Sequence, residues 1–114
     1  MTLDILGTIY NMLILSEKEM ENANNCGECD RYTKTIRINF NYFNQEDVHI
    51  EGEFKTIRHE IIHAFFHEAG LDCYAEDEVL VDALAILYPK ISKCIDEALF
   101  KEEQKEEEND GGTE

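Results

Sequence analysis

The chain has 114 residues, with 26 acidic side chains against 10 basic ones and a formal net charge of −16. That length suits one domain with a single modest core, and so large an acidic excess would repel a phosphate backbone or an anionic membrane. We therefore expect no nucleic acid and no membrane as partner. No apolar run approaches the roughly 20 residues of a membrane span, and the first residues carry no basic segment, so we expect a cytoplasmic protein.

The amino-terminal segment, residues 3–15, is rich in isoleucine, leucine and tyrosine and is interrupted by Gly7. It lacks a clean helical stripe, which favours an extended segment with a bend at Gly7, with a helix as the alternative. Residues 16–25 are polar. Ser16 followed by Glu19 fits a capping box for a short helix at most.

Two cysteines, Cys26 and Cys29, have the C-x-x-C spacing of half a metal knuckle or of a redox pair. The other half of a knuckle is missing, because Cys73 and Cys94 stand alone, and no apolar helix pattern follows the pair. The favoured interpretation is a tight turn that carries two thiols. Without an export signal, we expect these thiols to be reduced.

Residues 32–40 alternate apolar with polar or charged side chains, the period of a strand with one wet face. Lys34 and Arg37 would protect such a strand from aggregation, which predicts an edge strand. An edge strand beside an active site can hold an extended substrate by backbone pairing, whereas a plain structural strand is the alternative. Residues 41–52 read as a polar loop.

The most informative stretch is the helix predicted over residues 53–69, which ends at Gly70. It carries the H-E-x-x-H spacing in His59, Glu60 and His63. On a helix the two histidines lie about 40° apart and one turn up, so both imidazoles can reach one metal ion. Glu60 lies beside them, where a carboxylate can accept a proton from metal-bound water. The remaining helix surface is mostly apolar, so this polar sector must line a cleft or bind a metal.

His67 extends the histidine series by one more turn. On a continuous helix His59 and His67 lie about 12 Å apart along the axis, so one ion cannot bind both. We expect His67 to be a cleft-wall or surface residue.

A short loop is predicted over residues 71–74, followed by a second helix with acidic residues in its first turn. Pro89 should kink or restart this helix. Beyond Phe100, seven acidic residues against two lysines give the last part of the chain a net charge of −5. We therefore predict one domain over residues 1–100 and an acidic, disordered tail over residues 101–114.

The second helix also offers the third ligand that a catalytic zinc site needs. Glu78 and Asp82 stand four residues apart among almost entirely apolar neighbours. We expect Glu78 to be the ligand and Asp82 to hydrogen-bond the outer nitrogen of a ligand histidine. The reverse assignment, or another acid as ligand, stays open.

An H-E-x-x-H helix followed by an E-x-x-x-D helix resembles the gluzincins, the group of thermolysin. The run Thr56–Phe66 (TIRHEIIHAFF), with a strand over residues 35–38 and Cys29-Asp30 before it, looks like the small phage- and prophage-associated metallopeptidases of the ImmA/IrrE type. The resemblance implies an α+β, minimal zincin-like domain, with a small, mainly antiparallel sheet packed on the H-E-x-x-H helix and a second, ligand-bearing helix. Members of the better-studied branch cleave repressor proteins and carry an asparagine at the position of Asp82. That substrate class is not carried over.

The function expected from these residues is a zinc-dependent metallopeptidase acting on a protein or peptide substrate. One Zn²⁺ would be bound by His59, His63 and Glu78, with Glu60 as general base and then general acid. The alternative is a catalytically weak or inactive zinc-binding phage module that acts by binding a protein. The oligomeric state stays open. Residues that could line the cleft and stabilise the oxyanion besides zinc are Arg58, His67 and Tyr74.

Overall fold

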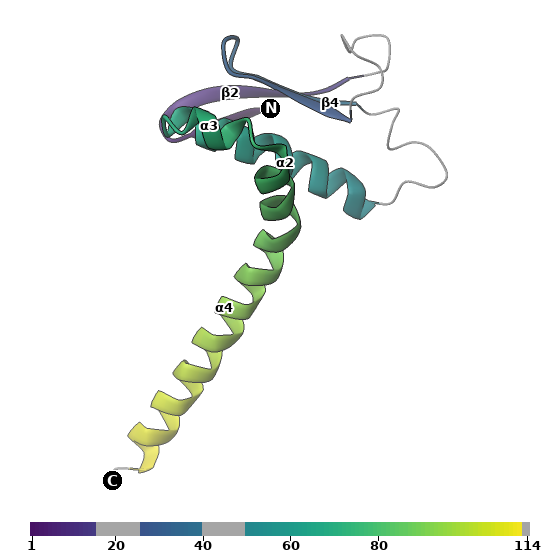
Figure 1. The fold of residues 1–114 in the computed structure, drawn as a ribbon. Coiled ribbons are helices and arrows are strands. Elements are labelled where there is room, and N and C mark those ends of the chain that lie inside the picture. The colour runs from purple at the N-terminus through teal and green to yellow at the C-terminus, as the bar shows by residue number, and fades with distance from the viewer. Residues whose placement is uncertain (16–25, 40–49, 113–114) are drawn as a thin grey trace.

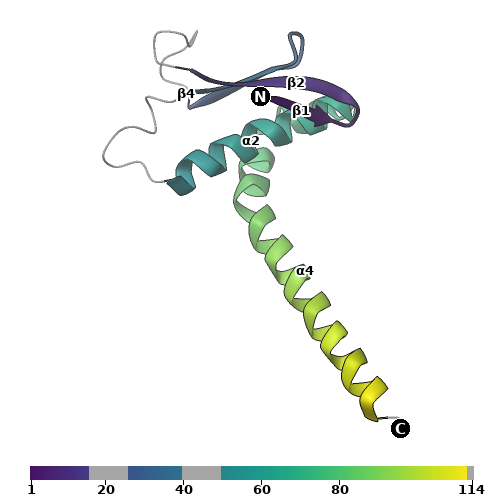
Figure 2. The same cartoon turned by 180° about the vertical axis from the view of Figure 1, so that it is seen from behind.

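The computed structural model describes residues 1–15, 26–39 and 50–112 and has an α+β fold. A small four-stranded sheet lies across helix α2, and helix α4 runs away from the sheet as one long rod (Figure 1 and Figure 2). The short helix predicted within residues 16–25, and most of the loop predicted over residues 41–52, lie outside the described residues. No helix in the described ranges is both long enough and apolar enough to cross a membrane.

The chain begins with a hairpin of β1 (Thr2–Ile5) and β2 (Thr8–Leu15), which pair antiparallel. Leu6 and Gly7 form its two-residue turn with φ values of 51° and 89°. Positive φ at both central residues is what a type I′ turn requires, and glycine takes it without strain. The backbone N–H of Gly7 also donates to Asp4 Oδ1 at 2.7 Å. The predicted extended segment with a bend at Gly7 is confirmed.

Two further strands, β3 (Gly27–Asp30) and β4 (Thr35–Asn39), complete a sheet of order β1-β2-β4-β3. The central pairing of β2 with β4 is parallel and the outer two are antiparallel, so the sheet is mixed. The prediction of an edge strand within residues 32–40 is wrong, because β4 pairs on both sides. Its inward residues Ile36 and Ile38 are fully buried. The edge strand on this side of the sheet is β3.

The C-x-x-C segment is also different from its prediction, since it enters strand β3 and does not form a tight turn. Successive side chains of a strand point to opposite faces, so Cys26 and Cys29, three positions apart, diverge. Cys29 lies opposite Ile36 in the sheet and packs against the core. Burial raises the pKa of its thiol to about 12, which keeps it protonated and unsuited to bind a metal.

Helix α2 (Ile50–Glu68) begins before the predicted start at residue 53 and ends as predicted. Gly70 follows it with φ 76° and donates its N–H to His67 O at 3.1 Å, while Leu71 N–H donates to Phe66 O at 2.8 Å. These two bonds form a Schellman motif, which needs a residue in the left-handed region at the position of Gly70.

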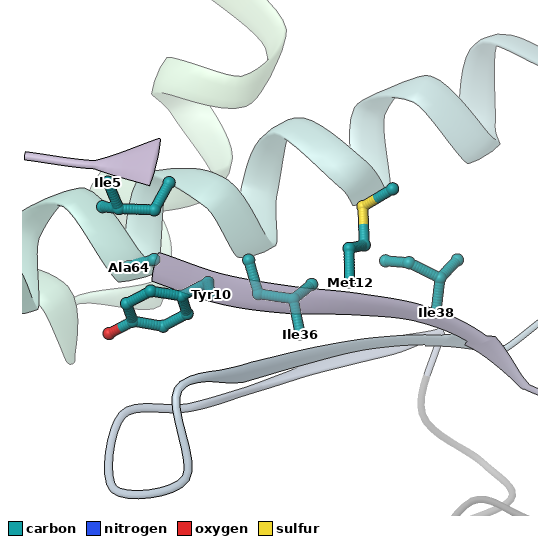
Figure 3. Close-up of a cluster of buried hydrophobic side chains, with 6 residues drawn as sticks. All are labelled: Ile5, Tyr10, Met12, Ile36, Ile38 and Ala64. Carbon is teal, nitrogen blue, oxygen red and sulfur yellow. The ribbon is translucent and has the colours of Figure 1, made fainter. Parts of the chain in front are cut away.

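The core fills the space between the sheet and α2 (Figure 3). Side chains from three of the strands meet the small Ala64 of α2, which lets the helix approach the sheet closely. The buried members of the cluster are Ile5, Tyr10, Met12, Ile36, Ile38 and Ala64.

The last residue of α2, Glu68, ties the helix to the sheet through polar contacts. Its carboxylate accepts from Thr8 Oγ1 at 3.0 Å, Tyr10 Oη at 2.8 Å and Lys34 Nζ at 2.6 Å. The hydrogen bond from Lys34 is the largest cause that lowers the pKa of Glu68 to about 2. The carboxylate is therefore charged at neutral pH and joins the end of α2 to β2 and to the turn before β4.

A one-turn helix, α3 (Asp72–Ala75), stands where a loop was predicted, and α4 (Glu78–Gly112) follows it. Asp77 caps α4, because its Oδ1 accepts from the N–H of Leu80 at 3.1 Å. The helix passes Pro89 and continues beyond Phe100, where we expected the tail to begin, as far as Gly112.

Pro89 has no N–H to donate to the carbonyl of Ala85, one turn earlier in α4. Arg58 of α2 supplies a replacement donor, since its Nε donates to Ala85 O at 2.8 Å. Pro89 thus leaves the carbonyl of Ala85 available to Arg58, and the resulting hydrogen bond holds α4 against α2.

Candidate metal centre

Three side chains from two helices converge at the point where α4 begins. His59 and His63 stand one turn apart on α2, and their Nε2 atoms are 3.1 Å apart. Glu78, the first residue of α4, places Oε2 3.0 Å from His59 Nε2 and Oε1 3.1 Å from His63 Nε2. The structure therefore brings together the three side chains that the sequence suggested as ligands.

Each histidine has a partner on its outer nitrogen as well. His63 Nδ1 lies 2.6 Å from the carbonyl oxygen of Ala75, which can only accept, so Nδ1 donates and Nε2 is left with a lone pair. His59 Nδ1 lies 3.4 Å from Asp82 Oδ1, a carboxylate that favours a proton on that nitrogen. A hydrogen bond from Lys55, 3.1 Å away, lowers the pKa of Asp82 and keeps it charged.

This donor set suits a cation. With both outer nitrogens protonated, two Nε2 lone pairs and a carboxylate face one another, an arrangement that repels unless a proton or a metal ion lies between them. Ligand atoms about 2.0–2.1 Å from a tetrahedral metal lie roughly 3.3 Å apart, close to the separations observed among His59, His63 and Glu78. Glu60 also lies close to this site, because the ligand atoms of His59, Glu60 and His63 are within 4.8 Å of one another and could hold a metal ion. The contacts of Glu78 with both Nε2 atoms favour Glu78 over Glu60 as the third ligand.

Glu60 is a buried carboxyl group on the sheet side of this cluster, only 6% exposed. Burial is the main cause that raises its pKa to about 8, and the nearby charges of Glu78 and Glu28 add to it. Burial also lowers the pKa of His63 and favours its neutral form. A carboxyl group that titrates near neutral pH is suited to accept and return a proton.

Strand β3 passes directly over Glu60. A Cβ at Gly27 would lie 3.0 Å from both Glu60 Cγ and Thr56 Cγ2, so glycine is what permits this close approach. We did not anticipate this role for Gly27 from the sequence, although a glycine inside a strand signals a close backbone contact.

His67 stands apart from the metal-binding group. Its Nδ1 lies 3.0 Å from Asp72 Oδ1, which also pairs with Arg31 at 3.1 Å. It lines a cleft of about 480 Å³ that runs along Glu28 to Asp30 of β3. The sequence had predicted a cleft-wall or surface residue at this position.

The other two predicted cleft residues, Arg58 and Tyr74, make contacts away from the histidines and Glu78. Arg58 donates through Nε to α4, as described above. Tyr74 of α3 is 52% exposed, and its ring centroid lies 6.2 Å from that of Phe66.

The residues that the sequence did not suggest are Ala75 and Lys55. The carbonyl of Ala75 depends on α3, which was predicted as a loop, and only the i to i+4 spacing of Lys55 and His59 on one helix hinted at Lys55.

Comparisons with protein-family models, curated proteins and solved structures found no match to this chain. The chemistry of the centre is therefore argued from its own geometry.

Proposed function

We propose that the protein is a zinc-dependent metallopeptidase with a minimal zincin-like architecture, in which His59, His63 and Glu78 bind one Zn²⁺. The observation that carries this proposal is that the two oxygens of Glu78 each lie within 3.0–3.1 Å of one histidine Nε2. Two neutral imidazoles and one carboxylate are the ligand set of many catalytic zinc sites, which leave a fourth position for water.

Asp82 is better suited to orient a ligand than to be one. It faces the outer nitrogen of His59 and is paired with Lys55. A carboxylate in that position fixes the tautomer and orientation of a ligand histidine and raises its basicity. These contacts support Glu78 over Asp82 as the third ligand.

Zinc, when bound, acts as a Lewis acid that makes a water molecule nucleophilic near neutral pH. With zinc bound, Glu60 would accept a proton from the attacking water and would return it to the leaving amine. Its position beneath Gly27, on the same helix as the two histidines, supports this role, because a proton acceptor must lie within reach of the water that it deprotonates.

An extended peptide is the substrate form that this surface favours. Among the described strands, β3 pairs with β4 alone, so its outer edge offers free backbone donors and acceptors. That edge begins at Gly27 over Glu60 and reaches the cleft beside His67. A peptide added to β3 would therefore lie with one bond near Glu60 and its continuation in the cleft. The role of substrate strand, first considered for residues 32–40, thus passes to β3.

The test is to measure zinc content and peptide hydrolysis together. Purified protein should bind one equivalent of zinc and cleave members of a mixed peptide library. Glu60→Gln should keep the zinc and lose turnover by roughly 10³-fold or more, because proton transfer by a positioned carboxylate contributes about 10²–10⁴-fold. Glu97→Gln, an exposed acid far along α4, should change neither quantity.

Three results would count against the proposal in different ways. Protein with less than half an equivalent of zinc that takes up none on titration would exclude a zinc site. Zinc-loaded protein that cleaves no peptide would favour the alternative of a zinc-dependent module that binds a protein. Glu60→Gln with undiminished turnover would remove Glu60 from the mechanism.

A further inference from the structure

His67, near the end of α2, belongs to a polar network that joins three elements. Its Nδ1 lies 3.0 Å from Asp72 Oδ1 at the start of α3, and the same oxygen lies 3.1 Å from Nη1 of Arg31. Arg31 stands in the turn between β3 and β4, where it also donates to Tyr32 Oη at 2.7 Å. The network therefore fixes the imidazole of His67 relative to α3 and to this turn.

The two ring nitrogens of His67 have different surroundings. The carboxylate of Asp72 can only accept, and the hydrogen bond from His67 is the largest cause that lowers its pKa and keeps it charged. Nδ1 therefore donates, and Nε2 of the neutral ring keeps a lone pair. None of the described residues binds Nε2. The side chain is only 13% exposed and lines the cleft, so Nε2 is left as an acceptor for a ligand there.

The cleft lies at a distance from the metal centre that a short stretch of peptide can span. His67 lies about 9 Å along the axis of α2 beyond the midpoint between His59 and His63. An extended chain rises about 3.3 Å per residue, so it covers this distance in about three residues.

Strand β3 follows α2 in the same direction. Gly27, at its first end, lies against Glu60. Arg31, just beyond its other end, reaches Asp72, which follows α2. A peptide paired with β3 would therefore run from the metal centre into the cleft beside His67.

Such a peptide also needs partners on its second side. In an added strand, every second residue directs its N–H and C=O away from the strand with which it pairs. Those groups face the wall of the cleft opposite β3. Among the described residues that line the cleft, His67 is the one that α2 contributes to this wall.

We infer that His67 is a substrate-binding residue, whose Nε2 accepts a hydrogen bond from the backbone N–H about three residues from the scissile bond. This role rests on the proposed peptidase function and adds a substrate class to it, namely extended peptides that reach the cleft. Peptides that end within two residues of the scissile bond on that side are poorer substrates. Asp72 is a positioning residue, because it acts through His67 by fixing its tautomer.

Kinetics on a nested set of peptides test this role. The best-cleaved member of the mixed peptide library is shortened one residue at a time, once from each end. His67→Ala should raise KM for the full peptide about 3–10-fold, the factor expected for one neutral hydrogen bond, with kcat within about twofold of the wild type. Removing the imidazole and removing the third residue should not add, because each removes one partner of the same hydrogen bond.

A second pair of variants tests the tautomer. The amide of Asp72→Asn can donate to Nδ1, which permits the tautomer that carries its proton on Nε2, so KM for the full peptide should rise several-fold. In the His67→Ala background the same change should add nothing. Asp96→Asn is the matched control, since Asp96 is exposed on the distal part of α4, and it should keep the KM of the wild type.

Circular dichroism and zinc uptake show whether each variant is folded. If His67→Ala is not, His67→Phe takes its place, because it keeps a ring and lacks the acceptor. An equal loss for the full and the shortened peptides, or no loss, would overturn the inference and leave the network a structural role. A fall in kcat at unchanged KM would also overturn it, since it would place His67 at the reacting bond.

Failure of the proposed function looks different. A zinc-loaded wild-type protein that cleaves no peptide of any length would overturn the peptidase proposal and the role of His67 with it. If the wild type cleaves peptides and His67→Ala does so with the same KM, the inference about His67 fails alone.

Discussion

The two parts of α4 resemble each other in sequence and differ in what surrounds them. The first part, from Glu78 to Ala85, packs on α2 through buried Val81 and carries the acids that meet the histidines. The second part, from Leu87 to Leu99, has five large apolar residues against four in the first, and these five are exposed within the described structure. Local sequence makes both parts helical, and only the chain topology decides which of them becomes part of a site.

This difference predicts where the effect of a substitution in α4 should appear. A change in the first part of α4 should reach the metal centre or the stability of the fold, because α2 and α4 hold each other there. A change at an exposed apolar or acidic residue of the second part should affect neither. Three of the following experiments, at Glu78, Val81 and Glu68, therefore set a residue of the packed domain against one further along α4.

The largest effect is expected at Glu78. Glu78→Ala removes a proposed ligand and should weaken zinc affinity by about 10³-fold or more, whereas Asp82→Ala should weaken it by about 10–100-fold, since Asp82 acts through His59. Glu97→Ala, on the projecting part, should leave it unchanged. Competition with a chromogenic chelator measures all three. A greater loss in Asp82→Ala than in Glu78→Ala would reverse the ligand assignment.

The next effect concerns packing. Val81→Ala opens a gap in a fully buried contact with α2 and should lower the free energy of unfolding by about 1–3 kcal/mol. Leu99→Ala removes more apolar surface but from an exposed position, so it should change the free energy by less than about 0.5 kcal/mol. Urea denaturation of both variants compares them. Equal losses in the two variants would mean that the projecting part also packs on the domain.

The same contrast explains what the sequence could predict. The bend at Gly7 and the end of α2 at Gly70 follow from local backbone preferences, and both are confirmed. The meeting of His59 with His63 follows from helical spacing alone. Such features need no knowledge of the partner elements.

The errors concern non-local contacts. Lys34 and Arg37 suggested an edge strand, yet β4 is central, because it pairs with both β2 and β3. Lys34 lies before the strand, where it forms an ion pair with Glu68 of α2. Cys26 and Cys29 suggested a turn, yet pairing with β4 makes the segment a strand. No local sequence pattern could reveal which strands and helices pair in this way. The contact of Glu78 with both histidines is also non-local, so the spacing of residues along the chain could suggest it but not establish it.

A smaller effect is expected where Arg58 binds the carbonyl that Pro89 leaves without a donor. Arg58→Met should cost about 1–3 kcal/mol, because the carbonyl of Ala85 then lacks its partner at the junction of α2 and α4. Pro89→Ala restores an N–H one turn away, so in that background Arg58→Met should cost clearly less. Urea denaturation of the four proteins in this cycle measures the coupling. Additive losses would show that Arg58 and Pro89 act independently.

The smallest effect is expected at Glu68, where glutamine keeps an oxygen that can still accept from Tyr10. Its pKa of about 2 in the folded state lies below the ordinary 4.5, so its charge stabilises the fold fully above about pH 4.5. This contribution is lost as the pH falls from about 4.5 toward 2, when the carboxylate that binds Lys34 becomes protonated. Glu68→Gln should therefore lower the urea midpoint at pH 7 and flatten its dependence on pH in that window.

Glu102→Gln makes the matching change on the projecting part of α4, where the side chain is exposed, and should leave the acid dependence of the urea midpoint as in the wild type. If both variants flattened the curve equally, the acid sensitivity would come from the net charge of −16 and not from the contact at the end of α2. If only Glu68→Gln did so, one ion pair between α2 and the turn before β4 would account for it. The comparison separates a local contact from the field of the whole chain, because both substitutions remove the same charge.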